Sequence, residues 1–314
     1  MHGDLATRDR VDDTQTTNTA ETIDVIVVSY NSREHLRGCV EPLSSFGHVN
    51  VVVVDNASPD ASLDAVRGLP VTAIQNDRNG GFAYGCNTGW RAGHAQYVLF
   101  LNPDARLDAS TLDALTAPLE NDDRLGAVAP RIVHEDGSLD FSQRRYPRLR
   151  STYAQALFLH RLFPHASWTD EVVRDDAQYV RHGSPDWVSG AAVMVRRSVL
   201  EELGGFDERF FMYCEDTDLC KRVWDLGREV RYEPEATVMH VGGGSAPRAS
   251  LLPVLASSRI RYARKHRGAA YAVLERIGVA LGALTHMVVS QGGRAARAGH
   301  ARSLKVAVSK SRAS

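Results

Sequence analysis

The chain has 314 residues, 43 % of them hydrophobic and 24 % charged, and this composition excludes a fibrous or wholly disordered protein. Its formal net charge of -1 hides an asymmetry, because residues 250–314 contain twelve Lys and Arg but only one acidic residue, Glu275. The chain is therefore an acidic body followed by a basic tail, and such a tail favours binding to an anionic surface.

The four cysteines and the N-terminal segment both indicate a cytoplasmic protein. Cys39, Cys86, Cys214 and Cys220 lack the CxxC spacing of zinc or redox sites, so we expect reduced thiols. Residues 1–21 are polar and contain no apolar run, which is typical of a disordered segment and not of a signal peptide.

Strands and helices alternate through the first hundred residues. The predicted elements are a strand at Ile23–Tyr30, a helix from Asn31 to about Ser45, a strand at Val49–Val54, a helix around Ser58–Arg67, a strand at Val71–Gln75, a helix at Gly81–Ala92 and a strand at Tyr97–Asn102. This alternation predicts an α/β fold with a doubly wound, mostly parallel sheet. Ligands of such sheets bind beyond the carboxyl ends of the strands.

The second half of the chain is less regular. We expect strands at Ala127–Val133 and Trp187–Arg196, a long and partly ordered excursion over 141–186, and a helix beginning near Glu215. The tail predicts helices at Leu251–His266, Tyr271–Ser290 and Arg294–Ser309. We therefore divide the chain into residues 1–21, a catalytic domain over 22–245 and a basic helical region over 246–314.

The longest apolar stretch in the tail is Ile277–Val289. A bilayer span needs about 20 residues, so this stretch favours an interfacial helix flanked by arginines over a transmembrane helix. The alternative is a helical cap that packs on the catalytic domain with its basic face in water.

Several common signatures are absent from the sequence. No Gly-Lys pair exists, which excludes a GxxxxGK[ST] phosphate loop, and there is no HExxH or GxSxG motif. The glycine-rich segment 79–85 lacks the dinucleotide fingerprint and follows the third predicted strand, so a nicotinamide enzyme is disfavoured.

Polar residues instead follow two of the predicted strands. Asp55-Asn56 closes a run of four valines, where a carboxylate can accept hydrogen bonds from a base or a ribose. Asn102-Pro103-Asp104 closes another strand, and a carboxylate on a loop stiffened by proline can hold a hard cation on a diphosphate. Either aspartate alone is more often a turn or capping residue, but two at strand ends of one sheet indicate a site.

A cluster of carboxylates begins the helix near residue 215. Glu215, Asp216 and Asp218 could serve only to cap the helix and complement its dipole, and Asp218 has the i,i+4 spacing for an ion pair with Arg222. The aromatic run 210–213 would also deliver Glu215 and Asp216 into a dry site, where like charges raise one pKa as a general base requires. The helix N-terminus opposes that shift.

A three-residue motif and one histidine are also notable for their positions. Asp216-Thr217-Asp218 matches a bare DxD pattern, but its place at a helix start argues against a metal site there. His240 follows a strand and precedes three glycines, Gly242–Gly244, that permit close backbone approach to a ligand, although a lone histidine is more often structural.

Five segments together resemble the inverting family 2 glycosyltransferases, with bacterial rhamnosyltransferase-type members the nearest in character. They are VIVVSYN (25–31), VVDNASPD (53–60), NGGFAYGCNTG (79–89), FLNPDA (100–105) and GGFDERFFMYCEDTDLCKR (204–222). The resemblance spans about Asp24–Ser245. It implies a GT-A fold, a nucleotide-sugar donor (dTDP- or UDP-linked) and a divalent cation, Mg²⁺ or Mn²⁺.

The resemblance also implies roles for individual residues. Asp216 would be the catalytic base with Glu215 supporting it, and Asp55 would read the pyrimidine edge. The nucleotide cradle would comprise Ser29, Tyr30, Asn31, Arg78 and Asn79. Asn102 and Asp104 would form the DxD-like motif, with Asp104 and His240 on the metal. Trp187, Ser189 and Gly190 would line the pocket for the donor sugar and acceptor.

The expected function is inverting transfer of a sugar, with L-rhamnose from dTDP-L-rhamnose favoured, to a saccharide that a polyprenyl diphosphate could carry. The basic tail would then hold the enzyme on the anionic inner face of the cell membrane. Alternatives are a UDP-sugar donor, an inactive sugar-nucleotide-binding homologue, or a sugar-1-phosphate nucleotidyltransferase, whose glycine-rich, arginine-containing loop is replaced here by SYNSREH (29–35). Nucleic acid is disfavoured as a partner because the tail lacks interleaved aromatic residues.

Overall fold

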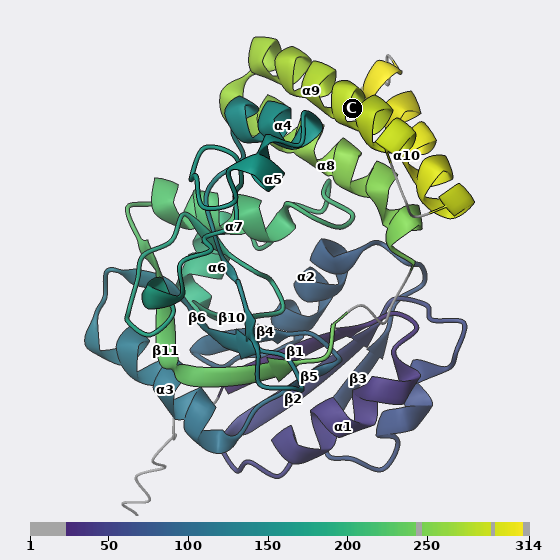
Figure 1. The fold of residues 1–314 in the computed structure, drawn as a ribbon. Coiled ribbons are helices and arrows are strands. Elements are labelled where there is room, and N and C mark those ends of the chain that lie inside the picture. The colour runs from purple at the N-terminus through teal and green to yellow at the C-terminus, as the bar shows by residue number, and fades with distance from the viewer. Residues whose placement is uncertain (1–22, 243–246, 290–292, 310–314) are drawn as a thin grey trace, which may run out of the picture.

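A mixed β-sheet forms the centre of the computed structural model, which describes residues 23–242, 247–289 and 293–309 (Figure 1). The strands are β1 (Ile23–Ser29), β2 (Val49–Asp55), β3 (Thr72–Gln75), β4 (Tyr97–Leu101), β5 (Ala105–Arg106), β6 (Leu125–Val133), β7 (Leu139–Asp140), β8 (Gln143–Arg144), β9 (Trp187–Val188), β10 (Ala192–Arg196) and β11 (Glu229–His240). The order across the sheet is β3-β2-β1-β4-β10-β6-β11-β5, with β7 on β6, and β8 pairs separately with β9.

Helices cover both faces of this sheet. They are α1 (Arg33–Leu43), α2 (Phe82–Ala92), α3 (Ala109–Asn121), α4 (Leu149–Ala156), α5 (Leu159–Leu162), α6 (Arg197–Leu203), α7 (Glu215–Asp225), α8 (Arg248–Arg267), α9 (Ala269–Val289) and α10 (Gly293–Val308), with 3-10 turns at Ser62–Val66 and Asp176–Gln178. In β1, Val25 and Val27 pack with α1 and α3, whereas Ile26 and Val28 pack with α2, α6 and α7. Burial on both faces explains the unbroken apolar run of this strand.

The predicted doubly wound arrangement is confirmed in the first half of the chain. Strand β1 runs parallel to β2 and β4, and β2 runs parallel to β3. The second half of the sheet is mixed, because β10 runs antiparallel to both β4 and β6 while β11 runs parallel to β6. The carboxyl ends of β1, β2, β3 and β4 therefore meet at one edge, where the sequence places its polar residues.

Two expectations for the second half need correction. The strand predicted at Trp187–Arg196 is broken into β9 and β10, because the Gly190 N–H donates to Asp216 instead of to a neighbouring strand. The excursion 141–186 contains α4, which apolar periodicity misses because its buried side chains are Ser151, Thr152 and two alanines.

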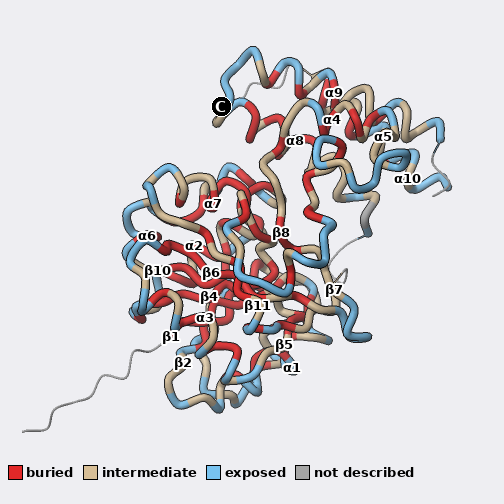
Figure 2. The backbone as a smooth tube through the Cα atoms, turned by 60° about the vertical axis from the view of Figure 1, so that its left-hand side comes forward, coloured by how far each residue is buried: buried red, intermediate tan, exposed pale blue. Residues whose placement is uncertain are grey.

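The three predicted tail helices are confirmed as α8, α9 and α10. They pack on one another and on α4 above the sheet (Figure 1). The contact is close, since a Cβ on Gly278 of α9 would lie 2.8 Å from Thr152 Cγ2, and Thr285 Oγ1 donates to the Ala156 carbonyl at 2.7 Å. Figure 2 shows buried residues concentrated at the sheet, whereas the tail helices are largely intermediate or exposed.

Helix α9 corrects the expectation that the apolar part of the tail is too short to cross a membrane. It has 21 residues, and among the described helices it alone is long and apolar enough to cross a membrane by length and composition. Its inner side packs as a helical cap, yet only 22 % of its most apolar 18-residue stretch is buried. Val273, Ile277, Leu284 and Val288 are exposed on it. The expectations for residues 1–21 and for Gly243-Gly244 lie outside the described residues, and the domain boundary at 245/246 stays a prediction.

Candidate active site

Asn102, Asp104 and His240 meet beyond the carboxyl end of β4. His240 Nε2 lies 3.1 Å from Asn102 Nδ2 and 3.2 Å from Asp104 Oδ1. His240 lies more than 130 residues after Asn102 and Asp104 in the sequence. Strand β5 pairs antiparallel with the end of β11 and sets Ala105 opposite His240. The local pairing of two strands therefore assembles the cluster.

The Asp104 carboxylate is prepared to act as an anion. Burial raises its pKa, but the hydrogen bond and charge of His240 outweigh burial and hold the pKa below its ordinary value. The Gly242 N–H also donates to Asp104 Oδ2 at 3.0 Å. The Asp104 carboxylate, the His240 imidazole and the side-chain amide oxygen of Asn102 are ligands of the types that suit a divalent cation such as Mg²⁺ or Mn²⁺.

A cation in this cluster would need ligands from outside the chain. The described residues contain no group of three or more His, Cys, Asp and Glu that could hold a metal by itself. Diphosphate oxygens of a bound nucleotide are ligands of the required type. The residues thus fit a metal that binds together with a nucleotide.

Glu215 and Asp216 form a second cluster at the start of α7. Asp216 Oδ2 accepts the Gly190 N–H at 3.1 Å, and Oδ1 accepts the Thr217 N–H at 2.7 Å. Burial raises the pKa of Asp216, although these two hydrogen bonds oppose the shift. Burial and the neighbouring Asp216 charge raise the pKa of Glu215 well above its ordinary value.

The two carboxyls are therefore unequal. Glu215 is buried, and its Oε2 has no hydrogen-bond partner among the described residues, whereas both Asp216 oxygens accept N–H groups. A proton shared by the pair belongs on Glu215, which leaves Asp216 ionised. Burial thus raises the pKa of these carboxyls more than the helix N-terminus lowers it, an outcome that the sequence alone leaves open.

The broken strand connects the two clusters. The Asn102 N–H donates to the Ala191 carbonyl at 2.9 Å, and the preceding residue, Gly190, holds Asp216. A Cβ on Gly190 would lie 3.3 Å from Asp216 Cβ, so this position favours glycine. Asn102 of the candidate cation cluster and the candidate base are thereby bonded to adjacent residues of one segment.

Several residues of the predicted nucleotide cradle lie at the ends of β1 and β2. Ser29 and Asp55 are register partners, and Ser29 Oγ is buried without a hydrogen-bond partner among the described residues. Asp55 accepts the N–H and the hydroxyl of Ser58 at 2.9 and 2.5 Å, and Ser58 Oγ accepts the Asn31 N–H at 3.1 Å. Half-buried Tyr30 lies between Ser29 and Asn31, in the loop after β1. Recognition of a base by Asp55 stays a prediction.

The loop after β3 is held against the segment before α7. Asn79 Oδ1 accepts the Gly81 N–H at 3.0 Å, and Gly81 has φ 88°. A Cβ on Gly81 would overlap the Phe211 carbonyl oxygen, so the close approach of the two loops requires glycine. Arg78 is exposed, with its guanidinium 4.9 Å from the Tyr84 ring centroid.

The β8–β9 ladder forms a wall beside Asp216. Trp187 Nε1 donates to the Arg145 carbonyl at 2.9 Å, and the Ser189 N–H donates to the Ser142 carbonyl at 3.1 Å. Arg144 is paired with Trp187 in the ladder, and its positive charge also lowers the pKa of Asp216. Sequence reasoning misses Arg144, because only the pairing of β8 with β9 places it near α7.

Asp218 has a structural role. It is fully buried and accepts from Arg222 Nε at 2.8 Å, which confirms the predicted i,i+4 pair. Lys265 and His266 of α8 contact its other oxygen at 2.5 and 2.7 Å. With both oxygens occupied, Asp218 is not available as the second ligand of a DxD metal site.

Comparison with known proteins decides the family. The model of "Glycosyl transferase family 2" matches residues 24–204, more than half of the chain. The chain belongs to glycosyltransferase family 2. The matched range includes Asp55, Asn102 and Asp104 but ends before Glu215, Asp216 and His240, whose placement comes from the structure.

Relatives of this glycosyltransferase include two rhamnosyltransferases. The N-acetylglucosaminyl-diphospho-decaprenol L-rhamnosyltransferase of Mycobacterium tuberculosis is 32 % identical over 266 residues, which cover 79 % of this chain and 86 % of the relative. Rhamnosyltransferase WbbL of Escherichia coli is 26 % identical over 230 residues, which cover 69 % of this chain and 82 % of the relative.

Solved structures share the fold. A mannosyltransferase from Pyrobaculum calidifontis, in complex with GDP-Man and Mn²⁺, aligns with a TM-score of 0.53 and 18 % identity. The alignment covers 91 % of this chain and 85 % of that one. The GT-A type fold expected from the sequence is confirmed.

Proposed function

We propose that this glycosyltransferase moves L-rhamnose from dTDP-L-rhamnose, with inversion, to a saccharide linked to a polyprenyl diphosphate, in the synthesis of a cell-envelope polysaccharide. One observation carries the proposal: the Gly190-Ala191 segment holds the Asp216 carboxylate on one side and the Asn102–Asp104–His240 cluster on the other. The names of the two rhamnosyltransferase relatives support the choice of donor and acceptor.

Asp216 is the proposed base. Its two N–H donors, Gly190 and Thr217, orient the carboxylate, and the protonated Glu215 beside it keeps the negative charge on Asp216. The carboxylate takes the proton of an acceptor hydroxyl, whose oxygen forms a bond to the anomeric carbon while the bond to the nucleoside diphosphate breaks.

Asp104 and His240 would hold the cation, Mg²⁺ or Mn²⁺, with Asn102 beside them. When bound, the cation neutralises charge on the departing nucleoside diphosphate. The Mn²⁺ and GDP-Man in the mannosyltransferase structure, which has the same fold, support a metal and a nucleotide sugar as joint ligands. We assign the nucleotide to the loops of Ser29, Tyr30, Asn31, Asp55, Arg78 and Asn79, and the donor sugar and acceptor to Trp187, Ser189 and Gly190.

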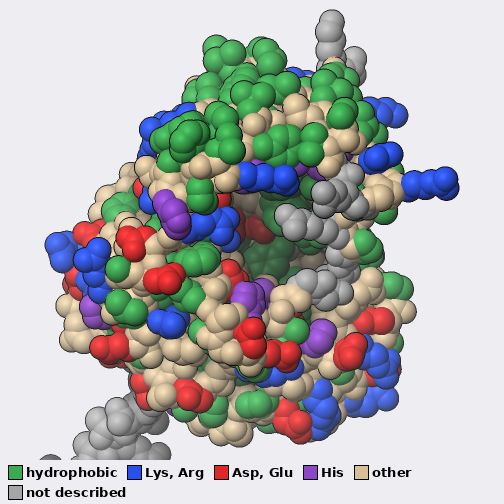
Figure 3. Space-filling model, viewed as in Figure 1, with side chains coloured by type: hydrophobic (Ala, Val, Ile, Leu, Met, Phe, Trp, Pro, Cys, Tyr) green, Lys and Arg blue, Asp and Glu red, His purple; other side chains and the backbone are tan. Residues whose placement is uncertain are grey.

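We further propose that the enzyme sits peripherally on the inner face of the cell membrane. Helix α9 exposes the apolar side chains of Val273, Ile277, Leu284 and Val288. Figure 3 shows hydrophobic side chains gathered at the top of the molecule, with Lys and Arg side chains around them. This combination of apolar area and positive charge suits an anionic bilayer. In Figure 3 the hollow beneath the tail helices would then face a lipid-linked acceptor.

Vesicle sedimentation tests the membrane proposal. The full chain should pellet with anionic vesicles and less with zwitterionic ones, and the Ile277→Glu/Val288→Glu variant should lose this binding. Val180→Glu, at another exposed apolar residue, is the control. Equal sedimentation of all three proteins would refute the role of α9.

A panel of nucleotide sugars tests the donor. A ligand that binds only the folded state raises its melting temperature, so dTDP-L-rhamnose with Mn²⁺ should give the largest shift. A larger shift with a UDP-sugar would reassign the donor. Consumption of dTDP-L-rhamnose with a polyprenyl-diphospho-N-acetylglucosamine acceptor should yield dTDP and a glycolipid, whereas release of a sugar 1-phosphate would indicate a nucleotidyltransferase.

A further inference from the structure

A cavity of about 470 Å³ lies beside strand β8. Its size is in the range of small-molecule sites. It is lined by β8 and the following residue, by two residues of the 173–178 stretch and by the segment that leads into β9: Gln143, Arg144, Arg145, Val173, Gln178, Arg181, His182, Gly183, Ser184, Pro185 and Asp186. No sequence motif includes this cavity, and the candidate active site involves only two of its lining residues, Arg144 through its charge and Arg145 through its carbonyl.

The cavity is positively charged. Arg144, Arg145 and Arg181 line it, and none of them forms an ion pair within the described part of the chain. Its one carboxylate, Asp186, is already engaged, because Oδ2 accepts the Tyr146 N–H at 2.8 Å and lies 3.8 Å from an Arg148 nitrogen outside the cavity lining. No carboxylate among the described residues therefore lies within ion-pair distance of the three guanidinium groups.

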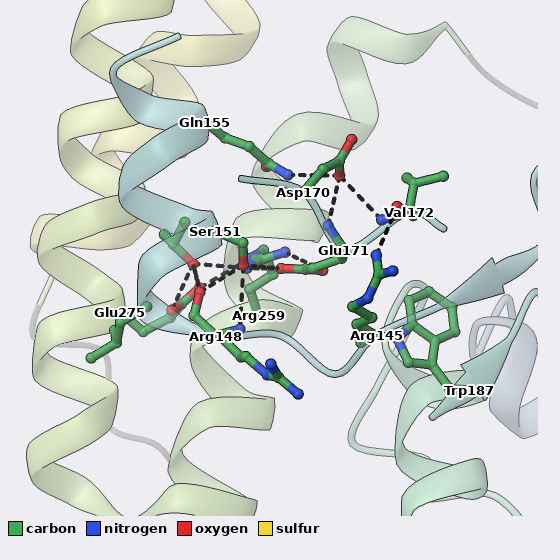
Figure 4. Close-up of polar contacts among 12 residues, drawn as sticks. Arg145, Arg148, Ser151, Gln155, Asp170, Glu171, Val172, Trp187, Arg259 and Glu275 are labelled. Atoms are coloured by element: carbon green, nitrogen blue, oxygen red, sulfur yellow. Dashed lines mark hydrogen bonds and ion pairs between the residues drawn. The ribbon is translucent and has the colours of Figure 1, made fainter. Parts of the chain in front are cut away.

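Two of the arginines are held in place but keep free donors. Arg144 Nε is buried with no hydrogen-bond partner among the described residues, and the guanidinium lies 5.9 Å from the Trp187 ring centroid. The Arg145 guanidinium donates one hydrogen bond to a described residue, from a terminal nitrogen to the Val172 carbonyl at 3.3 Å (Figure 4). A buried, unpaired donor is costly unless a ligand accepts from it.

The cavity and the candidate base share a wall. Arg144 is paired with Trp187 across the ladder, and Gly190, three residues further along that segment, donates to Asp216. The Arg144 charge also acts on the Asp216 carboxylate from this side. An anion bound by the arginines would therefore lie on the acceptor side of the site, apart from the Asn102–Asp104–His240 cluster assigned to the donor.

We propose that this cavity binds the diphosphate of the lipid-linked acceptor, with Arg144, Arg145 and Arg181 as its ligands. The inference rests on the proposed function for the identity of the acceptor. Arginine is suited to the task, because its planar fork of donors matches phosphate oxygens bidentately. Anchoring the diphosphate would present the sugar hydroxyl of the acceptor to Asp216 while the lipid extends toward the membrane.

Binding of inorganic pyrophosphate tests the cavity independently of the reaction. Calorimetric titration into the full chain, without metal because diphosphate chelates it, should show saturable binding that saturating dTDP leaves unchanged. Arg144→Gln and Arg181→Gln should each weaken the binding about tenfold, the loss of one charge-assisted hydrogen bond. Arg150→Gln, at an exposed arginine of α4, is the control. Displacement by dTDP, or equal binding by all four proteins, would overturn the proposal.

Kinetics then compare two acceptors of the same sugar. Arg181→Gln should raise the KM for a short-chain prenyl-diphospho-N-acetylglucosamine about tenfold, and raise that for a neutral octyl N-acetylglucosaminide much less. An equal change for both acceptors would overturn the subsite. If the wild-type enzyme used neither acceptor but still bound pyrophosphate in the cavity, the proposed acceptor would be wrong and the anion site would stand.

Discussion

Arg259 of α8 should hold the tail helices to the rest of the enzyme. Its guanidinium makes a two-point contact with Glu171 at 2.7 and 3.0 Å, and it also contacts Glu275 of α9 at 3.0 Å and Thr152 of α4 at 2.9 Å (Figure 4). Burial would lower the pKa of Arg259, but the two carboxylates outweigh burial and hold the pKa above its ordinary value. The positive charge of the Arg259 guanidinium is thus balanced by the same carboxylates that accept its hydrogen bonds.

Arg259→Leu would leave two nearly buried carboxylates facing each other, with Glu171 and Glu275 side chains 12 % and 2 % exposed. Removing one member of a buried ion pair costs about 3–5 kcal/mol. At roughly 2 °C per kcal/mol for a chain of this size, the melting temperature should fall by about 6–10 °C. Urea and thermal unfolding, followed by circular dichroism, measure both quantities.

The matched control is Arg264→Leu, at an exposed arginine of the same helix, which should change stability by less than about 0.5 kcal/mol. Replacing the whole cluster, as Arg259→Met with Glu171→Gln and Glu275→Gln, should recover at least half of the loss because no buried charge then remains unpaired. Equal stability of Arg259→Leu and Arg264→Leu would refute the reasoning.

Three further predictions concern the active site. Asp104→Ala should abolish the Mn²⁺ dependence of donor affinity in calorimetry; a dependence that persisted would move the metal elsewhere. Glu215→Gln should gain stability relative to wild type as the pH rises above about 4.3. In the wild type the raised pKa of Glu215 contributes stability at low pH, and this contribution is lost as the pH rises through that pKa, whereas glutamine does not titrate. Parallel stability curves of the two proteins from pH 5 to about 9 would contradict the raised pKa. Gly81→Ala should destabilise by about 1–3 kcal/mol more than Gly68→Ala in urea unfolding, because both have positive φ but only Gly81 meets a carbonyl; equal losses would contradict it.

The sequence predicts much of the fold because its signals are local. Apolar runs such as Val49–Val54 mark strands buried on both faces, and the three tail helices agree with α8, α9 and α10 within a few residues. Candidate site residues at strand ends can also be chosen from the sequence, since Asp55 and Asp104 follow apolar strands in a doubly wound sheet; their roles stay predictions. Pairing of β5 with β11 then brings His240 to Asp104, as the resemblance implied.

Features that depend on distant contacts were not predictable. The break at Ser189–Ala191 exists because Gly190 bonds to Asp216 of α7, and the sequence shows only a continuous strand pattern. Arg144 reaches the site only through the β8–β9 ladder. Helix α4 buries small and polar side chains against the tail, so it lacks the apolar periodicity on which helix prediction depends.

The central claim is that Asp216 is the base of a glycosyl transfer, and Asp216→Asn tests it most directly. The amide keeps the shape of the side chain but cannot take the acceptor proton, so the rate of transfer should fall by about 10²–10⁴-fold. The affinity for dTDP-L-rhamnose with Mn²⁺, measured by calorimetry on the same protein, should stay within about twofold of wild type. Transfer at a near wild-type rate, or loss of donor binding, would contradict the assignment.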